Sequence, residues 1–224
     1  MINRRDTVAR IVLEHSECAP VFQKHRIDYC CKGSMTLEEA CSARELDTPA
    51  VLADLESAIA ARRGSPDQDP RELNTPALVG HIMSHHHEYL RKALPFIQVL
   101  SNKVARVHGD HNPKLLDVHG TVESLVEALM PHLEQEEEVL FPALMVRGGD
   151  PTLIQKELAS MHEEHLEVGG MLDRLRTAAD EFVTPDWACN SYRTLFAELE
   201  ALEADILRHV HLENHVLMPR FAAS

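Results

Sequence analysis

Two stretches of the chain repeat a pattern of residues that can bind metal ions. His132–Pro142 and His209–Pro219 both read H-x3-E-x2-V-L-[FM]-P. Residues four positions apart share one face of a helix, so each stretch directs an imidazole and a carboxylate to one point. Another histidine stands 45 residues before the first stretch and 44 before the second, at His87 and His165. The duplication predicts a site for two metal ions with four histidine and two glutamate ligands: His87, His132, Glu136, His165, His209 and Glu213.

This set of ligands favours certain metals and a reactive site. Imidazole and carboxylate together suit iron, manganese or zinc. If Glu136 and Glu213 both bridge, each ion receives two nitrogens and two oxygens, which leaves roughly two open positions per ion in an octahedral set. Two divalent ions exceed the charge of two glutamates, so a hydroxide or oxide bridge helps to balance the site. The open positions admit small molecules such as O₂ or NO.

A single H-x3-E pair would be an ordinary surface contact on an acidic helix. The second copy, with its own upstream histidine, favours the metal site instead. His162, three residues before His165, is the most credible additional ligand. Glu164 is a candidate carboxylate that contacts a ligand side chain without itself binding the metal. His85 and His86 are expected in solvent or at the rim of the site. Glu137 and Glu138 are expected to belong to a solvated charge run. His211 and His215 break the repeat and are left out of the ligand set.

Composition limits the class of protein. The chain has 224 residues, 4% aromatic residues and a net charge of −14, which favours helices and argues against general nucleic-acid binding. No apolar run approaches the ~20 residues that span a bilayer, and no signal peptide is recognisable, so we expect a cytoplasmic protein without membrane contact. The five cysteines are odd in number and none is spaced as C-x2-C, which favours reduced thiols.

The punctuation of the sequence predicts an all-α protein. Gly, Ser, Pro and charges interrupt the pattern around residues 62–70. We therefore expect a small helical domain at 1–62, a linker at 63–73 and an up-down-up-down four-helix bundle at 74–224. The first two long helices are expected from Thr75-Pro76 to about Val107, and from Asn112-Pro113 to an end before Gly148-Gly149. The other two are expected from near Pro151 past Leu175, and from Thr184-Pro185 to about Phe221.

At these residues the chain resembles the repair-of-iron-centres family, di-iron proteins with a hemerythrin-like bundle behind a short cysteine-bearing domain. The resemblance covers nearly the whole chain. In the N-terminal part it depends on Phe22–Gly33, which contains Asp-Tyr-Cys-Cys, followed by Leu37 and Ala40. In the bundle it depends on the following residues: His87, His132-x3-Glu136, His165-x3-Gly169 and His209-x3-Glu213 with Pro219-Arg220.

The resemblance implies that the four histidines and two glutamates hold two non-haem iron ions, bridged by Glu136 and Glu213. It implies repair of iron–sulfur clusters damaged by nitric oxide or peroxide through iron donation, with damaged iron–sulfur proteins as partners and a possible homodimer. Cys30 and Cys31 are candidate transfer thiols for iron or a nitrosyl, whereas Cys18, Cys41 and Cys189 are expected to pack. Two alternatives stay open: a cytosolic NO or O₂ scavenger or sensor, and an NO reductase that forms N₂O.

Overall fold

The computed structural model describes residues 2–61, 69–146 and 148–221. Across these ranges the chain is helical without a β-strand, and its one isolated β-bridge joins Thr7 to Thr36. The all-α prediction is confirmed. No helix among the described residues is long and apolar enough to cross a bilayer. Contacts between Cα atoms divide the chain into two compact units, residues 1–78 with 207–224, and residues 79–206.

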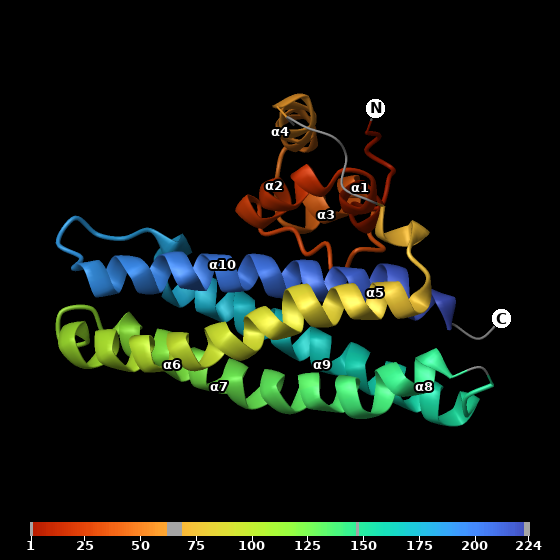
Figure 1. Ribbon diagram of the computed structural model, residues 1–224. Helices are drawn as coiled ribbons and strands as arrows, with labels where there is room; N and C mark the ends of the chain where they lie inside the picture. Colours follow the sequence, from red (N-terminus) through yellow and green to blue (C-terminus); the bar gives the residue numbers. More distant parts are fainter. Residues whose placement is uncertain (1, 62–68, 147, 222–224) are drawn as a thin grey trace. The chain divides into compact units, whose positions relative to one another are not determined.

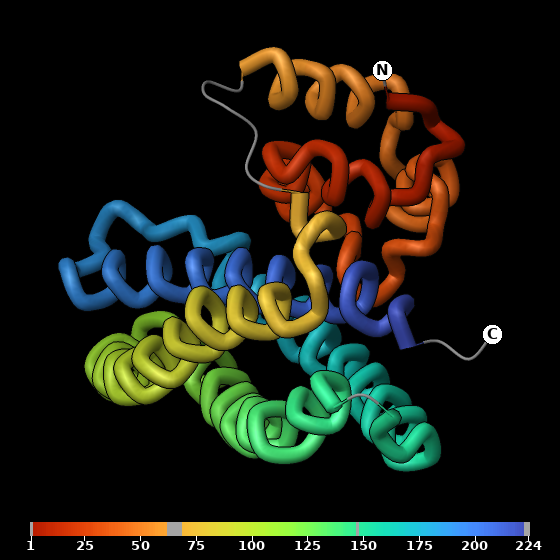
Figure 2. Tube along the Cα trace, turned by 45° about the vertical axis from the view of Figure 1, so that its right-hand side comes forward, coloured from red at the N-terminus to blue at the C-terminus, as the bar shows by residue number. Residues whose placement is uncertain are grey.

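The first unit begins with short helices that the local sequence starts and stops. They are α1 (Val8–Glu14), η1 (Ser16–Cys18), α2 (Ala19–Lys24), α3 (Leu37–Ala43) and α4 (Thr48–Ala61). A capping box starts α3, because the Thr36 hydroxyl accepts from the Glu39 backbone amide and the Glu39 carboxylate accepts from the Thr36 backbone amide. Phe22, Leu37 and Leu55 are fully buried, and α4 packs on α2 and α3 (Figure 2).

The boundaries of the predicted linker stay a prediction. Residues 62–68 lie outside the described residues. The described end of the linker is not irregular throughout, since Pro70–Glu72 form a 3-10 turn, η2. The Asp69 carboxylate caps this turn by accepting from the Arg71 amide.

Four long helices build the bundle, and in the second unit they run lengthwise beside one another (Figure 1). Helix α6 packs on α7, and α7 packs on α9. The elements are α5 (Thr75–Ile82), η3 (Met83–His87), α6 (Glu88–His108), α7 (Lys114–Gln135), η4 (Glu136–Leu140), α8 (Phe141–Met145), η5 (Asp180–Phe182), α9 (Pro151–Ala178), α10 (Asn190–Leu212), η6 (Glu213–Leu217) and η7 (Met218–Arg220). The predicted four-helix bundle is confirmed.

The start of the fourth helix was predicted too early. Thr184-Pro185 lies in a loop, and α10 begins at Asn190. The cause is the side chain of Arg193, which donates to the Thr184 hydroxyl and to the carbonyls of Pro185, Asp186 and Ala188. Because these groups hold the preceding loop around the guanidinium, residues 184–188 do not continue the helix.

Three π-helical segments interrupt the long helices at the candidate ligands. The segment η3 ends at His87, whereas η4 begins at Glu136 and η6 begins at Glu213. In η4 the Phe141 amide donates to the Glu136 carbonyl, and in η6 the Met218 amide donates to the Glu213 carbonyl. The sequence repeat is therefore also a repeat of backbone structure. Such π-turns occur often at functional sites.

Candidate metal centre

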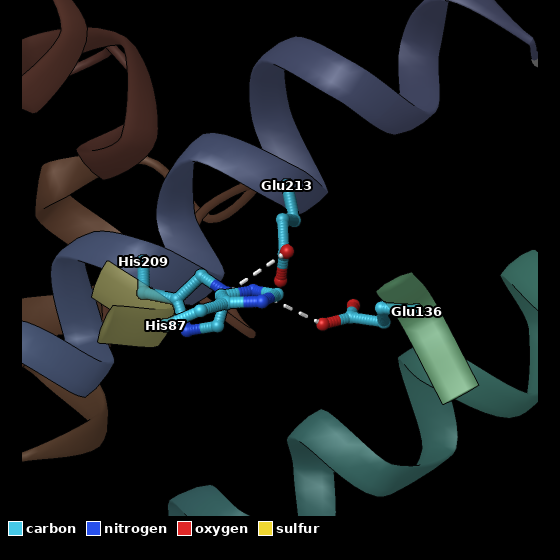
Figure 3. A group of neighbouring side chains, drawn as sticks. All are labelled: His87, Glu136, His209 and Glu213. Atoms are coloured by element: carbon cyan, nitrogen blue, oxygen red, sulfur yellow. Dashed lines mark hydrogen bonds and ion pairs between the residues drawn. The ribbon is translucent and has the colours of Figure 1, made fainter. Parts of the chain in front are cut away.

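The six predicted ligands lie together in two groups that share both glutamates. One group is His87, Glu136, His209 and Glu213, and the other is His132, Glu136, His165 and Glu213. In each group the ligand atoms lie within 4.8 Å of one another. Figure 3 shows the first group, with the side chains directed to a common point. No member is more than 6% exposed. Two groups with common carboxylates are consistent with a dinuclear metal site.

Glu136 belongs to both groups, and its two oxygens have different histidine neighbours. Its Oε2 lies 3.4 Å from His87 Nε2, and its Oε1 lies 3.5 Å from His132 Nε2. His132 Nε2 is also 3.3 Å from His165 Nε2. The two oxygens thus face imidazoles of different groups. At the second copy, His209 Nε2 lies 2.9 Å from Glu213 Oε1.

Two carboxylates outside the centre hold the far nitrogens of ligand histidines. His87 Nδ1 lies 2.8 Å from Glu137 Oε1, and His132 Nδ1 lies 2.6 Å from Glu164 Oε2. With Nδ1 as donor, Nε2 has a lone pair for a metal ion. The hydrogen bond from His132 lowers the pKa of Glu164. Burial raises the pKa of Glu137, but hydrogen bonds from His87 and Arg91 outweigh burial and leave it lowered.

These contacts support the expectation for Glu164 and correct the one for Glu137. Glu137 is not part of a solvated charge run, because it accepts from His87 and from Arg91, whose Nη2 is 2.9 Å away. His86 was expected at the rim but is 4% exposed and lies 2.8 Å from Asp205 through Nδ1. Asp205 lies on α10 and Glu137 in η4, so the two consecutive histidines are buried against different neighbouring elements. His162 belongs to neither ligand group found among the described residues.

Two family models match the chain. One, described as hemerythrin HHE cation binding domain, matches residues 79–221, and one described as a domain of unknown function (DUF542) matches residues 4–59. The iron-sulfur cluster repair protein ScdA of Staphylococcus haemolyticus is 30% identical over 224 residues, 99% of this chain and 100% of that protein. The iron-sulfur cluster repair protein YtfE of Yersinia pseudotuberculosis is 30% identical over 217 residues, 97% of this chain and 96% of that protein.

This chain belongs to the iron-sulfur cluster repair family. The resemblance seen at the Asp-Tyr-Cys-Cys segment and at the repeated His/Glu pattern is confirmed by full-length similarity to ScdA and YtfE.

The structure describes all five cysteines of this repair-family chain, and none forms a disulfide. Cys18 and Cys41 are buried, as expected of packing residues. Cys189 is exposed, so its predicted packing role is wrong; its Sγ lies 3.2 Å from His108 Nε2 instead. The predicted transfer thiols lie side by side, with 3.4 Å between Cys30 Sγ and Cys31 Sγ.

A small cleft in the second unit reaches the centre of this repair-family chain from the side of α9. Its lining includes His132 and Glu136 together with Glu157 and Glu164. Glu157 is itself 7% exposed, and its Oε2 accepts a hydrogen bond from the side-chain Nε2 of Gln135 at 2.7 Å. The cleft therefore borders the His132 side of the candidate site.

Proposed function

We propose that this protein repairs iron–sulfur clusters damaged by nitrosative or oxidative stress, and that it does so by donating iron. The two ions are iron, held by His87, His132, Glu136, His165, His209 and Glu213. The observation that carries the proposal is the pair of buried ligand groups sharing two glutamates. Similarity over the whole chain to proteins named for cluster repair supports it.

The ligand set suits iron that must leave again. Six side chains would hold two ions, so coordination positions would remain open. A ligand from an acceptor protein could bind there before the protein's own ligands dissociate. Imidazole and carboxylate hold ferrous iron without the tight thiolate cage of a structural site. Glu164 and Glu137 keep His132 and His87 in the ligating tautomer, and the buried walls around Glu136 limit water.

The remaining assignments are part of the same proposal. The protein acts in the cytoplasm, where a reducing environment keeps cysteines such as these five as free thiols. Its partners are damaged iron–sulfur proteins, with NO or O₂ as small ligands, and a homodimer stays a prediction. We further propose that residues 1–62 form a cysteine-bearing domain joined to the bundle at 74–224, and that Cys30 and Cys31 pass iron or a nitrosyl.

The test is anaerobic rescue of a purified enzyme whose [4Fe–4S] cluster was damaged by NO. The protein is first loaded with isotope-labelled iron, and the client's activity and labelled iron are then measured. Wild type restores both. Glu136→Leu restores neither, while Glu138→Leu, a change at an exposed neighbour, behaves as wild type. Undiminished rescue by Glu136→Leu contradicts the proposal, as does rescue without label in the client.

The cleft beside His132 and Glu136 favours one second candidate, a protein that binds NO at the same ions as a scavenger, sensor or reductase. Such a protein retains its iron in the rescue assay. Feeding NO and an electron donor then separates the variants of this function. A reductase forms many equivalents of N₂O, whereas a scavenger or sensor forms less than one.

A further inference from the structure

A second cluster of metal-binding side chains lies in the first unit, apart from the six ligands described above. Asp28, Cys30 and Cys31 place one ligand atom each within 4.8 Å of the others. Cys30 Sγ lies 3.2 Å from Asp28 Oδ1 and 3.4 Å from Cys31 Sγ. Cys30 is buried, whereas Asp28 and Cys31 are partly exposed. The cluster therefore has a closed side and a side open to solvent.

The backbone of this loop is held from both directions. Asp28 Oδ1 accepts from the amides of Cys30 at 3.1 Å and Cys31 at 2.8 Å. On the other side, the Cys30 carbonyl accepts from Asn214 Nδ2 at 3.0 Å and from His215 Nε2 at 2.8 Å. The backbone that carries both thiols is thus held before any ion arrives, which reduces the entropy lost on binding.

The loop's contacts explain where the two sequence copies differ. The second copy has His211, Asn214 and His215 where the first has glutamates, at positions 134, 137 and 138. Asn214 and His215 hold the Cys30 carbonyl, and His211 Nδ1 lies 3.2 Å from the Tyr29 carbonyl. Carboxylates at these places would repel the carbonyl oxygens. The second copy is therefore adapted to carry the cysteine loop.

The chemistry of the cluster calls for a cation. Once both thiols lose their protons, two thiolates and a carboxylate at these distances repel one another, and burial adds to the cost of charge on Cys30. In the protein without an ion, the hydrogen bond with Cys31, followed by burial and Asp28, raises the pKa of Cys30 well above its usual value. A divalent ion removes this conflict, because it replaces the thiol protons and attracts all three ligands.

We propose that Asp28, Cys30 and Cys31 form a third metal site, which binds one thiolate-preferring divalent ion such as Fe²⁺ and leaves one coordination position open. Binding forms two metal–sulfur bonds and one metal–oxygen bond, and the two thiols release their protons to solvent without a change of oxidation state. Tetrahedral bonds of about 2.3 Å separate two sulfur ligands by roughly 3.8 Å. The present separation of 3.4 Å requires only a small outward movement.

The open position distinguishes this site from a structural one, because sites that exchange ligands keep a vacancy. The loop is also held by residues that are adjacent in sequence to a candidate ligand of the larger centre. Asn214 and His215, which hold the Cys30 carbonyl, directly follow Glu213 in the π-segment η6. The use of the site for iron on its way to a client depends on the proposed function above; the existence of the site does not.

The test is an anaerobic titration of the full-length, iron-loaded protein with Co²⁺, followed by optical spectroscopy. Bands for charge transfer from thiolate to Co²⁺ exclude the larger centre, because its six candidate ligands contain no sulfur, and the cysteine variants below assign the bands among the thiols. We expect these bands in wild type, with saturation at one ion per chain. Cys30→Ser and Cys31→Ser should each weaken the bands strongly. Asp28→Asn, whose amide oxygen can still accept from the backbone, should keep them and weaken Co²⁺ binding by roughly tenfold or more.

Cys41→Ser and Cys189→Ser are the matched controls, and both should bind Co²⁺ as wild type does. The partly exposed Cys31 tolerates serine, so its variant remains informative if Cys30→Ser fails to fold. The proposal is overturned if wild type shows no thiolate band, if the band survives Cys31→Ser, or if Asp28→Asn binds as tightly as wild type. These outcomes leave the iron rescue assay unaffected, so failure here and failure of the proposed function are distinguishable.

Discussion

Glu164→Gln tests whether the carboxylate outside the centre supports the metal ligand His132. Glu164 Oε2 lies 2.6 Å from His132 Nδ1. Glutamine keeps an oxygen that can accept this hydrogen bond and removes the charge. A hydrogen bond to a charged group contributes about 1.5–3 kcal/mol, and a neutral one about 0.5–1.5 kcal/mol. The difference is at the low end here, because the Glu164 side chain is 43% exposed and solvent screens its charge.

We therefore expect a loss of about 1 kcal/mol in metal binding, which is roughly a fivefold increase in dissociation constant. Glu164→Ala removes the acceptor itself and should weaken ferrous iron binding by about 10–100-fold. Loss of a carboxylate that hydrogen-bonds a ligand histidine has about this effect in other metal sites. The assay is competition for ferrous iron with a coloured chelator under anaerobic conditions. Glu163→Gln, at the exposed neighbour, is the control and should bind as wild type does. An affinity for Glu164→Ala within twofold of wild type refutes the argument.

Three further changes test the scaffold, each by urea unfolding. Arg176→Met leaves the buried Glu203 carboxylate without its guanidinium and should cost about 3 kcal/mol, whereas the double change with Glu203→Leu should recover most of it; equal losses would contradict this. Gly33→Ala places a Cβ 2.4 Å from the Tyr29 carbonyl oxygen and should cost about 2 kcal/mol, with Gly80→Ala, which has open space, as the control. Thr36→Ala removes the hydroxyl of the capping box and should cost about 1 kcal/mol; no loss would show that the box contributes nothing.

The clustering of the candidate ligands could be predicted because two copies of one pattern specify it. A helical repeat fixes which residues share a face, and the duplication identified His132 and Glu136 with His209 and Glu213 as equivalent. The long helices could be predicted for a similar reason, since capping residues and prolines mark their ends. The exception was the start of α10, where the side chain of Arg193 holds the loop from five to nine residues away.

Other features depend on structure that periodicity does not contain. His86 and His87 are both buried because they pack against different neighbouring elements, His86 against Asp205 on α10 and His87 against Glu137 in η4. Glu137 seemed to belong to a charge run, because its partners His87 and Arg91 are on another helix. The contacts of the cysteine loop left a visible signal in the sequence, namely the loss of glutamates at His211, Asn214 and His215.

The most direct test of the account is the number of iron ions that the full chain binds. The protein is reconstituted anaerobically with excess ferrous iron, freed of unbound metal in the presence of a thiol-blocking reagent, and analysed for iron per chain. We predict two ions for wild type and for Glu138→Leu. Because both ligand groups include Glu136, we predict fewer than one for Glu136→Leu. A single ion in wild type, or two ions in Glu136→Leu, would contradict the shared-carboxylate centre.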